Sequence, residues 1–452
     1  MASAKDSAPE LLITDSRLNR SYAIPIHPGG YVEATAFAGV KDTSGEGLML
    51  FDEGSRNTAC IKSAVSHLNA ATGELQYRQY PIQDLFGNYG FAENVHLLVF
   101  GSLPNADQKK TLDRTLAQSM LTYIDASKVI QSFARTAPMM TMIMGGLSAC
   151  NALEPHFIPV HEDRDIYGDA ESVDDHVIRT LAALAVVISA AYCHKQSLPL
   201  QKPRENFSFM DNMLFMMNFI SKETGLPIPE QVRHVDDLVL LHSEHGTCNA
   251  TAAFLHTAST RADPIACLSA GLAAIYGPMH GGSNIVTYHQ LRTIGSTTNI
   301  PATIQQVKNR KRRLYGFGHR IYRAVDPRAT LLKQFLQDRA KEGVPMSPYM
   351  QVALELERIV ETDTFFTSRK LKANTDLYTV LAYESIGIPE ELVFPFICIS
   401  RTVGFLAHWK EQMAKLTLPV QLLLLRRGDR NKFTSGHRYS GRPNFEFEDY
   451  TR

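Results

Sequence analysis

The sequence predicts a mostly helical protein that begins with a short strand-rich segment. Apolar residues recur at helical spacing, or fill whole helices, from about residue 80 onward. A content of 44% hydrophobic and 20% charged residues is typical of a globular chain with a large buried core. The length of 452 residues allows two or three domains, so the helices need not share one core.

Short β-prone runs mark the N-terminal segment. The runs 11–15 and 21–26 are separated by turn-forming residues, which is the pattern of short paired strands. We therefore expect residues 1–45 to form a small strand-rich segment before the helices begin.

The predicted helices are separated by clusters of proline, glycine and aspartate. Two stretches, 139–144 and 182–187, are apolar almost all round and should lie in buried helices. The methionines of the first stretch are expected to fill the core rather than to line a ligand site. The predicted helical stretches are 104–127, 137–152, 173–192, 207–224 and 264–276.

Residues 281–381 are more basic and more amphipathic than the chain on either side. The sequence Asp-Pro-Arg at 326–328 is a strong helix start, because aspartate caps helix N-termini and proline suits the first helical position. Arg328 is then expected in the positively polarised first turn of that helix. We predict a smaller helical domain at 281–381, flanked by 46–280 and 382–452, which together form a large helical domain.

Composition argues against several classes of function. The net charge is zero, so the chain as a whole is not suited to bind nucleic acid or an anionic membrane. The most apolar run, 181–192, is far shorter than a membrane span. The two ends show no secretion, mitochondrial or peroxisomal signal, so a cytoplasmic location is expected. The cysteines are scattered without a CxxC pattern, as expected for reduced thiols, at positions 60, 150, 193, 248, 267 and 398.

Four separated islands carry the residues of chemical interest: 277–284, 315–328, 374–376 and 400–404. In the first, His280 precedes two glycines, which let a backbone approach a ligand closely, and a helix is expected to restart at about residue 283. A structural histidine is the alternative. In the third, Asp376 precedes an apolar stretch, so a helix N-cap is the alternative to a catalytic carboxylate.

The second island surrounds His319 with positive charge. Eight of the 21 residues from 308 to 328 are lysine or arginine. A solvated helix face is one alternative, and a nucleic-acid patch is another because aromatic residues are interleaved. The neutral total charge favours a small polyanion, such as a nucleotide-bearing cofactor, over nucleic acid.

A metal site is the alternative for the cluster of His242, Glu244, His245 and Cys248. Zinc ligands on one helix must face a common point, and the spacing of these residues does not show that they do. A fourth ligand is not evident either, so no metal is predicted. We expect His245 instead to donate a hydrogen bond to an anionic substrate.

The islands together supply the groups needed to join a thioester to a keto acid at carbon. One carboxylate, Asp376, can remove the weakly acidic proton next to the thioester carbonyl. His280 can stabilise the enolate oxygen, and His319 can polarise the acceptor carbonyl. Arg328 and Arg401 can hold the carboxylates of the keto acid in the reacting orientation.

These ordered motifs resemble the citrate synthase family over most of the chain. The resemblance begins at residues 14–17 and 22–26, continues through 52–59 and reaches 401–409, and the strand-rich start is similar to the bacterial-type branch that some fungal enzymes share. The resemblance implies a two-domain helical fold that closes over its substrates and excludes water, and at least a homodimer. It implies acyl-CoA and oxaloacetate as substrates, with no cofactor.

The resemblance also implies a role for each site residue. Asp376 would be the base, His280 the donor to the enolate oxygen and His319 the group that polarises the oxaloacetate carbonyl. His245, Arg328 and Arg401 would hold oxaloacetate. The residues implied for the CoA phosphates are Arg323, Arg320 and Lys370.

The chain departs from the family pattern in the oxaloacetate motifs. The family usually has aspartate before the binding histidine and glutamate after it, where this chain has Glu244 and Gly246. Leu418 stands where the family has an arginine that reaches the oxaloacetate of the neighbouring subunit. The basic residues that offer a substitute are Arg426, Arg427 and Arg442.

A third departure concerns the acyl group. Ile397 stands where the family commonly has phenylalanine, four residues before the arginine that matches Arg401. The smaller side chain predicts room for an acyl group larger than acetyl, as in an alkylcitrate synthase. An ordinary citrate or 2-methylcitrate synthase is the alternative, and a non-catalytic CoA-binding relative is an alternative of another class.

Overall fold

The computed structural model describes residues 9–48, 50–52, 57–59, 61–162, 170–319 and 321–413. The chain divides into two compact units, Met1–Lys62 and Ser63–Arg452. Several residues named above lie outside the described part, namely Cys60, Arg320, Leu418, Arg426, Arg427 and Arg442.

A two-stranded antiparallel hairpin forms the first unit's regular structure, as predicted. Strand β1 (Glu10–Asp15) pairs with β2 (Arg20–Pro25), with Glu10 opposite Pro25 and Asp15 opposite Arg20. The Asp15 carboxylate accepts a hydrogen bond from the backbone N–H of Arg17 at 2.9 Å, which fixes the turn. A short 3₁₀ helix, η1 (Ala34–Gly39), follows.

The second unit begins with a small sheet that the sequence pattern did not predict. Strands β3 (Ser66–Asn69), β4 (Glu74–Tyr77) and β5 (Tyr80–Pro81) pair antiparallel in this order. The side chain of Tyr77 is completely buried, so the sheet packs against the helices rather than standing free.

The rest of the second unit is helical, and the five predicted helical stretches are all present. The helices before residue 280 are α1 (Ile82–Leu85), α2 (Phe91–Val95), η2 (His96–Phe100), α3 (Ala106–Tyr123), η3 (Ile124–Ala126), α4 (Ser127–Ile130), α5 (Met139–Leu153), η4 (Pro155–Phe157), α6 (Pro159–Glu162), α7 (Ala170–Gln196), α8 (Phe209–Met216), α9 (Pro229–Leu241), α10 (Asn249–Ala258) and α11 (Pro264–Ile275). Helix α8 is shorter than the predicted 207–224, and Asn218, two residues beyond its end, has a φ of 64°.

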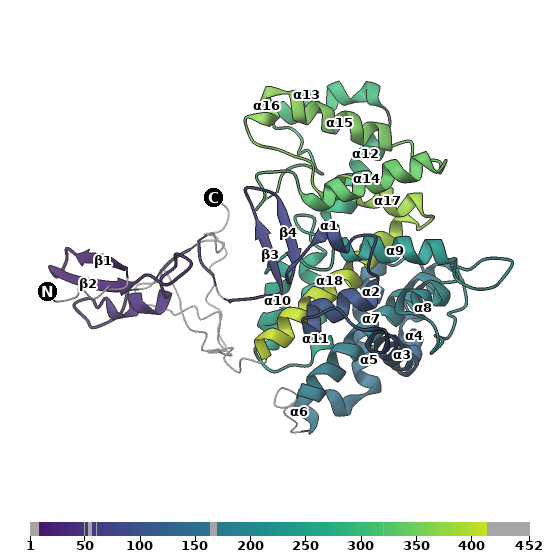
Figure 1. Ribbon diagram of the computed structural model, residues 1–452, viewed down its shortest axis with the longest axis horizontal. Coiled ribbons are helices and arrows are strands. Elements are labelled where there is room, and N and C mark those ends of the chain that lie inside the picture. Colours follow the sequence, from purple (N-terminus) through teal and green to yellow (C-terminus); the bar gives the residue numbers. More distant parts are fainter. Residues whose placement is uncertain are drawn as a thin grey trace. The chain divides into compact units, whose positions relative to one another are not determined.

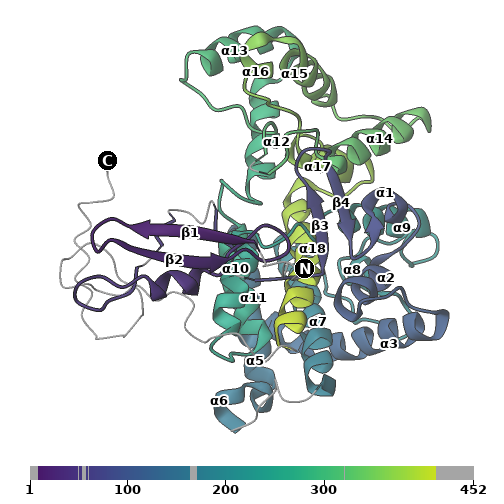
Figure 2. The ribbon, with the colours of Figure 1, turned by 60° about the vertical axis from the view of Figure 1, so that its left-hand side comes forward.

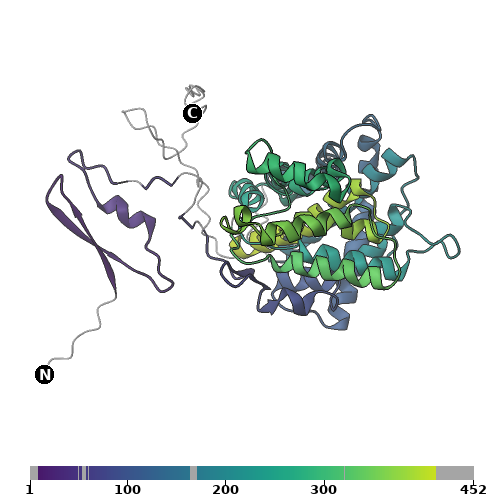
Figure 3. The same cartoon turned by 90° about the horizontal axis from the view of Figure 1, so that it is seen from above.

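The later helices include both helix starts that the sequence predicted. They are α12 (Ser283–Ile294), η5 (Thr297–Asn299), α13 (Ile300–Lys308), α14 (Pro327–Lys341), α15 (Met350–Thr362), α16 (Thr364–Thr367), η6 (Thr375–Leu377), α17 (Thr379–Ser385) and α18 (Glu390–Met413). Helices α12 to α17 gather at one end of the unit (Figure 1). Seen from above, these green helices cover the earlier ones (Figure 3). The domain boundaries at 281 and 381 stay a prediction.

Helices α7 and α18 form the middle of the core, and α18 runs through the helical body in both side views (Figures 1 and 2). Residues 182–187 of α7 are buried on every side, as predicted. Both helices are long and apolar enough to cross a membrane by length and composition, and the apolar stretch of each is entirely buried within the fold. The run at 181–192 thus belongs to a longer helix than the run alone indicates.

Candidate active site

Hydrogen bonds bring three of the four islands together. Nδ2 of Asn374 donates to the carbonyl oxygen of Gly318 at 2.8 Å. The hydroxyl of Ser283 donates to Oδ2 of Asp376 at 2.5 Å. The islands at 277–284, 315–328 and 374–376 therefore form one site.

His280 lies in the turn between α11 and α12, and packing requires the two glycines that follow it. A Cβ on Gly281 would lie 2.8 Å from Cγ1 of Ile275, and one on Gly282 would lie 2.5 Å from the carbonyl oxygen of Tyr276. Nε2 of His280 is buried and has no hydrogen-bond partner among the described residues. A buried polar atom of this kind is available for a substrate oxygen.

Asp376 has the environment of a general base rather than of a helix cap. Burial raises the pKa of Asp376 to about 6, against the opposing hydrogen bond from Ser283 and the charge of Arg328. Asn374 is the cap of η6, because its side chain accepts the backbone N–H of Asp376 at 3.0 Å. The carboxylate is thus more basic than an exposed aspartate and still mostly ionised at neutral pH.

His319 presents a neutral N–H group. Its Nδ1 accepts hydrogen bonds from the backbone N–H groups of Ile321 at 3.0 Å and Tyr322 at 3.2 Å. Burial, and then the positive charge of Arg328, lower the pKa of His319 to about 4. The ring is therefore neutral at pH 7, and Nε2 carries the proton because Nδ1 is an acceptor. Such a group can polarise a carbonyl oxygen without adding a formal charge.

His245 lies next to His319, with ring centroids 5.1 Å apart. Its Nε2 is 3.1 Å from the hydroxyl of Tyr322, one of the interleaved aromatic residues, which was not predicted to belong to the site. Burial, and after it the positive charge of Arg328, hold the pKa of His245 well below its usual value. Arg328 acts on the pKa of His245, His319 and Asp376 alike, which places its charge among these three groups.

Arg328 is held by the residue that caps its helix. Asp326 caps α14 and accepts from Nε of Arg328 at 3.0 Å and from Nη2 at 2.7 Å. Both side chains are buried, and Nη1 takes no part in this ion pair. The geometry leaves one guanidinium edge that can receive a substrate carboxylate.

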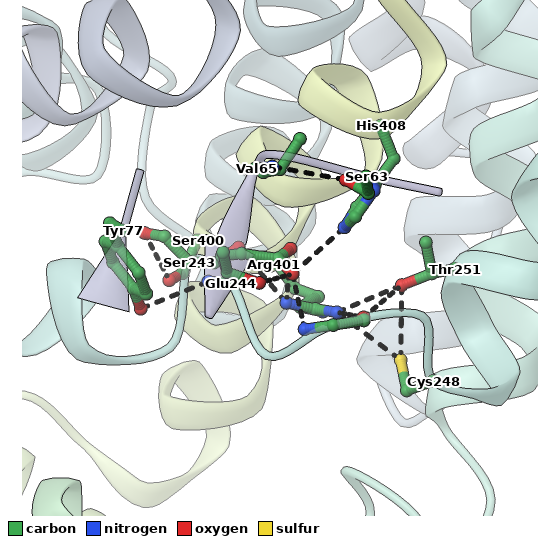
Figure 4. A network of polar contacts seen from close by, with 12 residues as sticks. Ser63, Val65, Tyr77, Ser243, Glu244, Cys248, Thr251, Ser400, Arg401 and His408 are labelled. Carbon is green, nitrogen blue, oxygen red and sulfur yellow. Dashed lines mark hydrogen bonds and ion pairs between the residues drawn. The ribbon is translucent and has the colours of Figure 1, made fainter. Parts of the chain in front are cut away.

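Arg401 occupies the centre of a second buried network, on α18 (Figure 4). Its Nη1 donates to Oε2 of Glu244 at 3.0 Å, and its Nη2 donates to Oγ1 of Thr251 at 3.0 Å and to the carbonyl oxygen of Gly246 at 2.7 Å. The Sγ of Cys248 lies 3.5 Å from the same Nη2. The network joins the fourth island to the segment that carries His245.

Glu244 is the charge that balances Arg401. Its Oε1 accepts from the hydroxyl of Ser66 at 2.9 Å and lies 3.0 Å from Nε2 of His408. Burial alone would raise the pKa of Glu244, but Arg401 and His408 lower it to about 2. Oε1 also accepts the backbone N–H of Gly246. Glu244, which stands where the family usually has aspartate, therefore supplies a fully ionised carboxylate that pairs with Arg401.

The structure separates the cluster considered as a metal site in the sequence. Nε2 of His242 lies 3.3 Å from Oγ1 of Thr379, whereas Glu244 binds Arg401. Within the described residues, the side chains close enough together to hold a metal ion are instead those of His245, His319 and Asp326, whose ligand atoms lie within 4.8 Å of one another. Both carboxylate oxygens of Asp326 are already engaged by Arg328, so a cation would have to compete with a guanidinium.

The hairpin of β3 and β4 supports the site and is the main feature that the sequence pattern missed. The backbone N–H of Arg323 donates to the carbonyl oxygen of Ala70 at 2.9 Å, in the turn of the hairpin. The Tyr77 hydroxyl donates to the carbonyl oxygen of Leu240 at 3.0 Å and accepts the backbone N–H of Glu244 at 3.1 Å. The hairpin thus contacts both the loop of His319 and the end of α9.

Three of the residues predicted to bind CoA or the acyl group, Arg323, Lys370 and Ile397, lie in the described part of the chain. The side chains of Arg323 and Lys370 are exposed, as a contact with CoA phosphates requires. Ile397 is 5% exposed and lies one turn before Arg401 on α18. These three roles stay predictions.

A buried carboxylate of raised pKa, a neutral imidazole N–H and two buried arginines on a mostly helical fold are suited to an enzyme that performs acid–base chemistry on an anionic substrate. Residues 54–421 match the family model described as citrate synthase, C-terminal domain. The chain belongs to the citrate synthase family, whose members bind acyl-CoA and oxaloacetate as substrates.

Similar proteins include two from fungi and one solved bacterial structure. The chain is 36% identical to the citrate synthase-like protein oryE of Aspergillus oryzae, over 96% of this chain and 99% of that protein. It is 32% identical to the alkylcitrate synthase phiJ of a fungal species, over 91% of this chain and 92% of that protein. The crystal structure of citrate synthase from Thermotoga maritima matches with a TM-score of 0.68 and 26% identity, over 80% of this chain and 92% of that one.

Proposed function

We propose that the chain condenses an acyl-CoA longer than acetyl-CoA with oxaloacetate and hydrolyses the resulting thioester, which makes it an alkylcitrate synthase. The observation that carries the proposal is the joining of the islands into one site. In this site are Asp376, a carboxylate of raised pKa, His280, whose buried Nε2 has no hydrogen-bond partner in the described residues, and His319, a neutral N–H donor. The proposed reaction needs each of these groups.

The proposed steps follow from the protonation states. Asp376 removes a proton from the carbon next to the thioester carbonyl, while His280 hydrogen-bonds the enolate oxygen. The carbon nucleophile attacks the keto carbon of oxaloacetate, whose oxygen is polarised by Nε2–H of His319. Arg328 and Arg401 hold the carboxylates, because a guanidinium matches a carboxylate with two parallel hydrogen bonds. Water then cleaves the thioester to a carboxylate and free CoA thiol.

The acyl specificity rests on Ile397. The residue is buried on α18 one turn from Arg401, so its side chain is near the predicted oxaloacetate anchor. Isoleucine has less volume than phenylalanine and no flat ring, which leaves space for carbons beyond acetyl. The similarity to a protein named alkylcitrate synthase supports the same proposal. A homodimer and a cytoplasmic location belong to this proposal as well.

The test is the rate of thiol release from a series of acyl-CoAs, acetyl to decanoyl, with and without oxaloacetate. We expect oxaloacetate-dependent release that peaks beyond acetyl, and a shift of the peak toward acetyl in Ile397→Phe. A peak at acetyl or propionyl in the unmodified protein would assign an ordinary citrate or 2-methylcitrate synthase. Binding of CoA without any release would indicate a non-catalytic relative.

A further inference from the structure

Tyr322 contacts two of the histidines in the candidate active site. Its hydroxyl lies 3.1 Å from Nε2 of His245, and its backbone N–H donates to Nδ1 of His319 at 3.2 Å. The three rings pack against one another, with centroids 4.8 Å apart for Tyr322 and His319, 5.4 Å for Tyr322 and His245, and 5.1 Å for the two histidines. Tyr322 is only 3% exposed, so its hydroxyl depends on a hydrogen-bond partner within the protein.

All three rings are uncharged at neutral pH. Burial raises the pKa of Tyr322, so the phenol keeps its proton. Burial, and after it the positive charge of Arg328, hold the pKa of His245 and the pKa of His319 below their usual values, so both imidazoles are neutral. A neutral imidazole has one nitrogen that donates and one that accepts, and the partner of one nitrogen decides which is which.

The contact between Tyr322 and His245 allows two proton arrangements, and the available partners favour one of them. Within the described residues, Nε2 of His245 is the one hydrogen-bond partner of the Tyr322 hydroxyl. If that nitrogen donated, the buried phenolic proton would be left without an acceptor. If the phenol donates, the proton of His245 is on Nδ1, which has no partner in the described part of the chain and is not one of its fully buried unpaired atoms. A substrate or water can therefore reach Nδ1–H.

We propose that Tyr322 is a positioning residue that sets the tautomers of both histidines. Its hydroxyl holds the His245 proton on Nδ1, and its backbone N–H, together with that of Ile321, holds the His319 proton on Nε2. Each ring then keeps one N–H for the substrate, where the other tautomer would present a lone pair to an anion. The inference rests on the proposed function in taking both rings as donors to the keto acid.

The first measurement reads the tautomers directly, from ring-nitrogen NMR spectra of histidine-labelled protein at pH 7 without substrate. His245→Gln lacks one set of signals and so assigns those of His245. The unmodified protein should carry the His245 proton on Nδ1. In Tyr322→Phe, His245 should move toward the Nε2–H form because the donor to Nε2 is gone. His319 should keep its proton on Nε2, since its backbone partners remain.

The second measurement is the steady-state rate of thiol release. Tyr322→Phe weakens one hydrogen bond to the keto acid, so it should raise KM for oxaloacetate about tenfold and change kcat and KM for acyl-CoA less than about twofold. A general loss of packing would not divide the parameters in this way. Tyr192→Phe is the matched control and should leave all three unchanged, because Tyr192 is a buried tyrosine of α7 that stacks on Phe219.

Three results would overturn the proposal. The first is a His245 proton on Nε2 in the unmodified protein, a result that needs no variant to fold. The others are His245 signals that do not change in Tyr322→Phe, and a fall in kcat at unchanged KM for oxaloacetate.

The outcomes distinguish this inference from the proposed function, because the spectra need no activity. A His245 tautomer that depends on Tyr322, in a protein without oxaloacetate-dependent thiol release, would retain the tautomer control and refute the synthase. Condensation activity with a His245 tautomer that Tyr322→Phe leaves unchanged would do the reverse.

Discussion

The hydroxyl of Ser283 sets the pH at which the proposed base becomes active. Ser283 donates to Oδ2 of Asp376 at 2.5 Å, and this hydrogen bond favours the ionised carboxylate. A hydrogen bond to a charged group contributes about 1.5–3 kcal/mol, and one pH unit corresponds to about 1.4 kcal/mol. Ser283→Ala should therefore raise the pKa of Asp376 above its present value of about 6 by roughly one to two pH units.

The sign of the effect follows from the role of the base. Only ionised Asp376 accepts the proton, so the rate is lost as the pH falls through its pKa. At pH 6 the unmodified enzyme should work at about half of its plateau rate, and Ser283→Ala at about one tenth or less. Both should approach their plateaus at high pH, since the carboxylate is intact.

The assay is kcat/KM for thiol release between pH 5 and pH 9, which reports the free enzyme. Ser385→Ala is the matched control, because the Ser385 hydroxyl lies in α17 and donates to the carbonyl oxygen of Ala382 at 2.7 Å. An acidic limb in Ser283→Ala that coincides with that of the unmodified enzyme and of Ser385→Ala would refute the reasoning. It would mean that Asp376 is not the group whose ionisation controls the rate.

Four further results are expected. Asp376→Asn should lower kcat by about 10²–10⁴-fold without changing the thermal unfolding midpoint greatly, and activity close to normal would exclude the base assignment. His319→Ala should lower kcat by about 10²–10³-fold through loss of the polarising N–H, as checked in the same thiol assay. Glu244→Gln should lower the free energy of unfolding by about 3–5 kcal/mol in urea titrations, because Arg401 is left buried without its counter-charge. Since the pKa of Glu244 is depressed to about 2 from its usual 4.5, its stabilising contribution should be full above pH 4.5 and be lost as the pH falls toward 2.

Short sequence patterns predicted the features that depend on neighbouring residues, namely helix ends and a buried helix. The cap at Asp326 and the helix restart at Ser283 follow from the preferences of residues at helix ends, and both are confirmed. The buried stretch 182–187 follows from composition alone. The identity of the family followed from motifs in order, and the matching family model confirms it.

Partners that are distant in the sequence could not be predicted in this way. Glu244 and Arg401 are 157 positions apart, and the hydrogen bond from Ser283 to Asp376 spans 93. The β3–β4 hairpin was missed because its strands are only four residues long, too short for an alternating pattern to stand out. One signal for the pair of Glu244 and Arg401 was available in the sequence. A buried arginine needs a counter-charge, and Glu244 is the acidic residue next to His245.

Helix α18 carries Ile397, Arg401, Gly404 and His408 at spacings of four, three and four, so they share one face. Gly404 admits no side chain there, because a Cβ would lie 2.3 Å from the carbonyl oxygen of Ser243 and 2.4 Å from Oε2 of Glu244. Inserting one residue before this face would rotate the earlier part by about 100° relative to the later part. The role proposed for position 397 in acyl specificity is therefore best tested by exchange of its side chain, because the contacts of Arg401 and Gly404 fix the register of this helix.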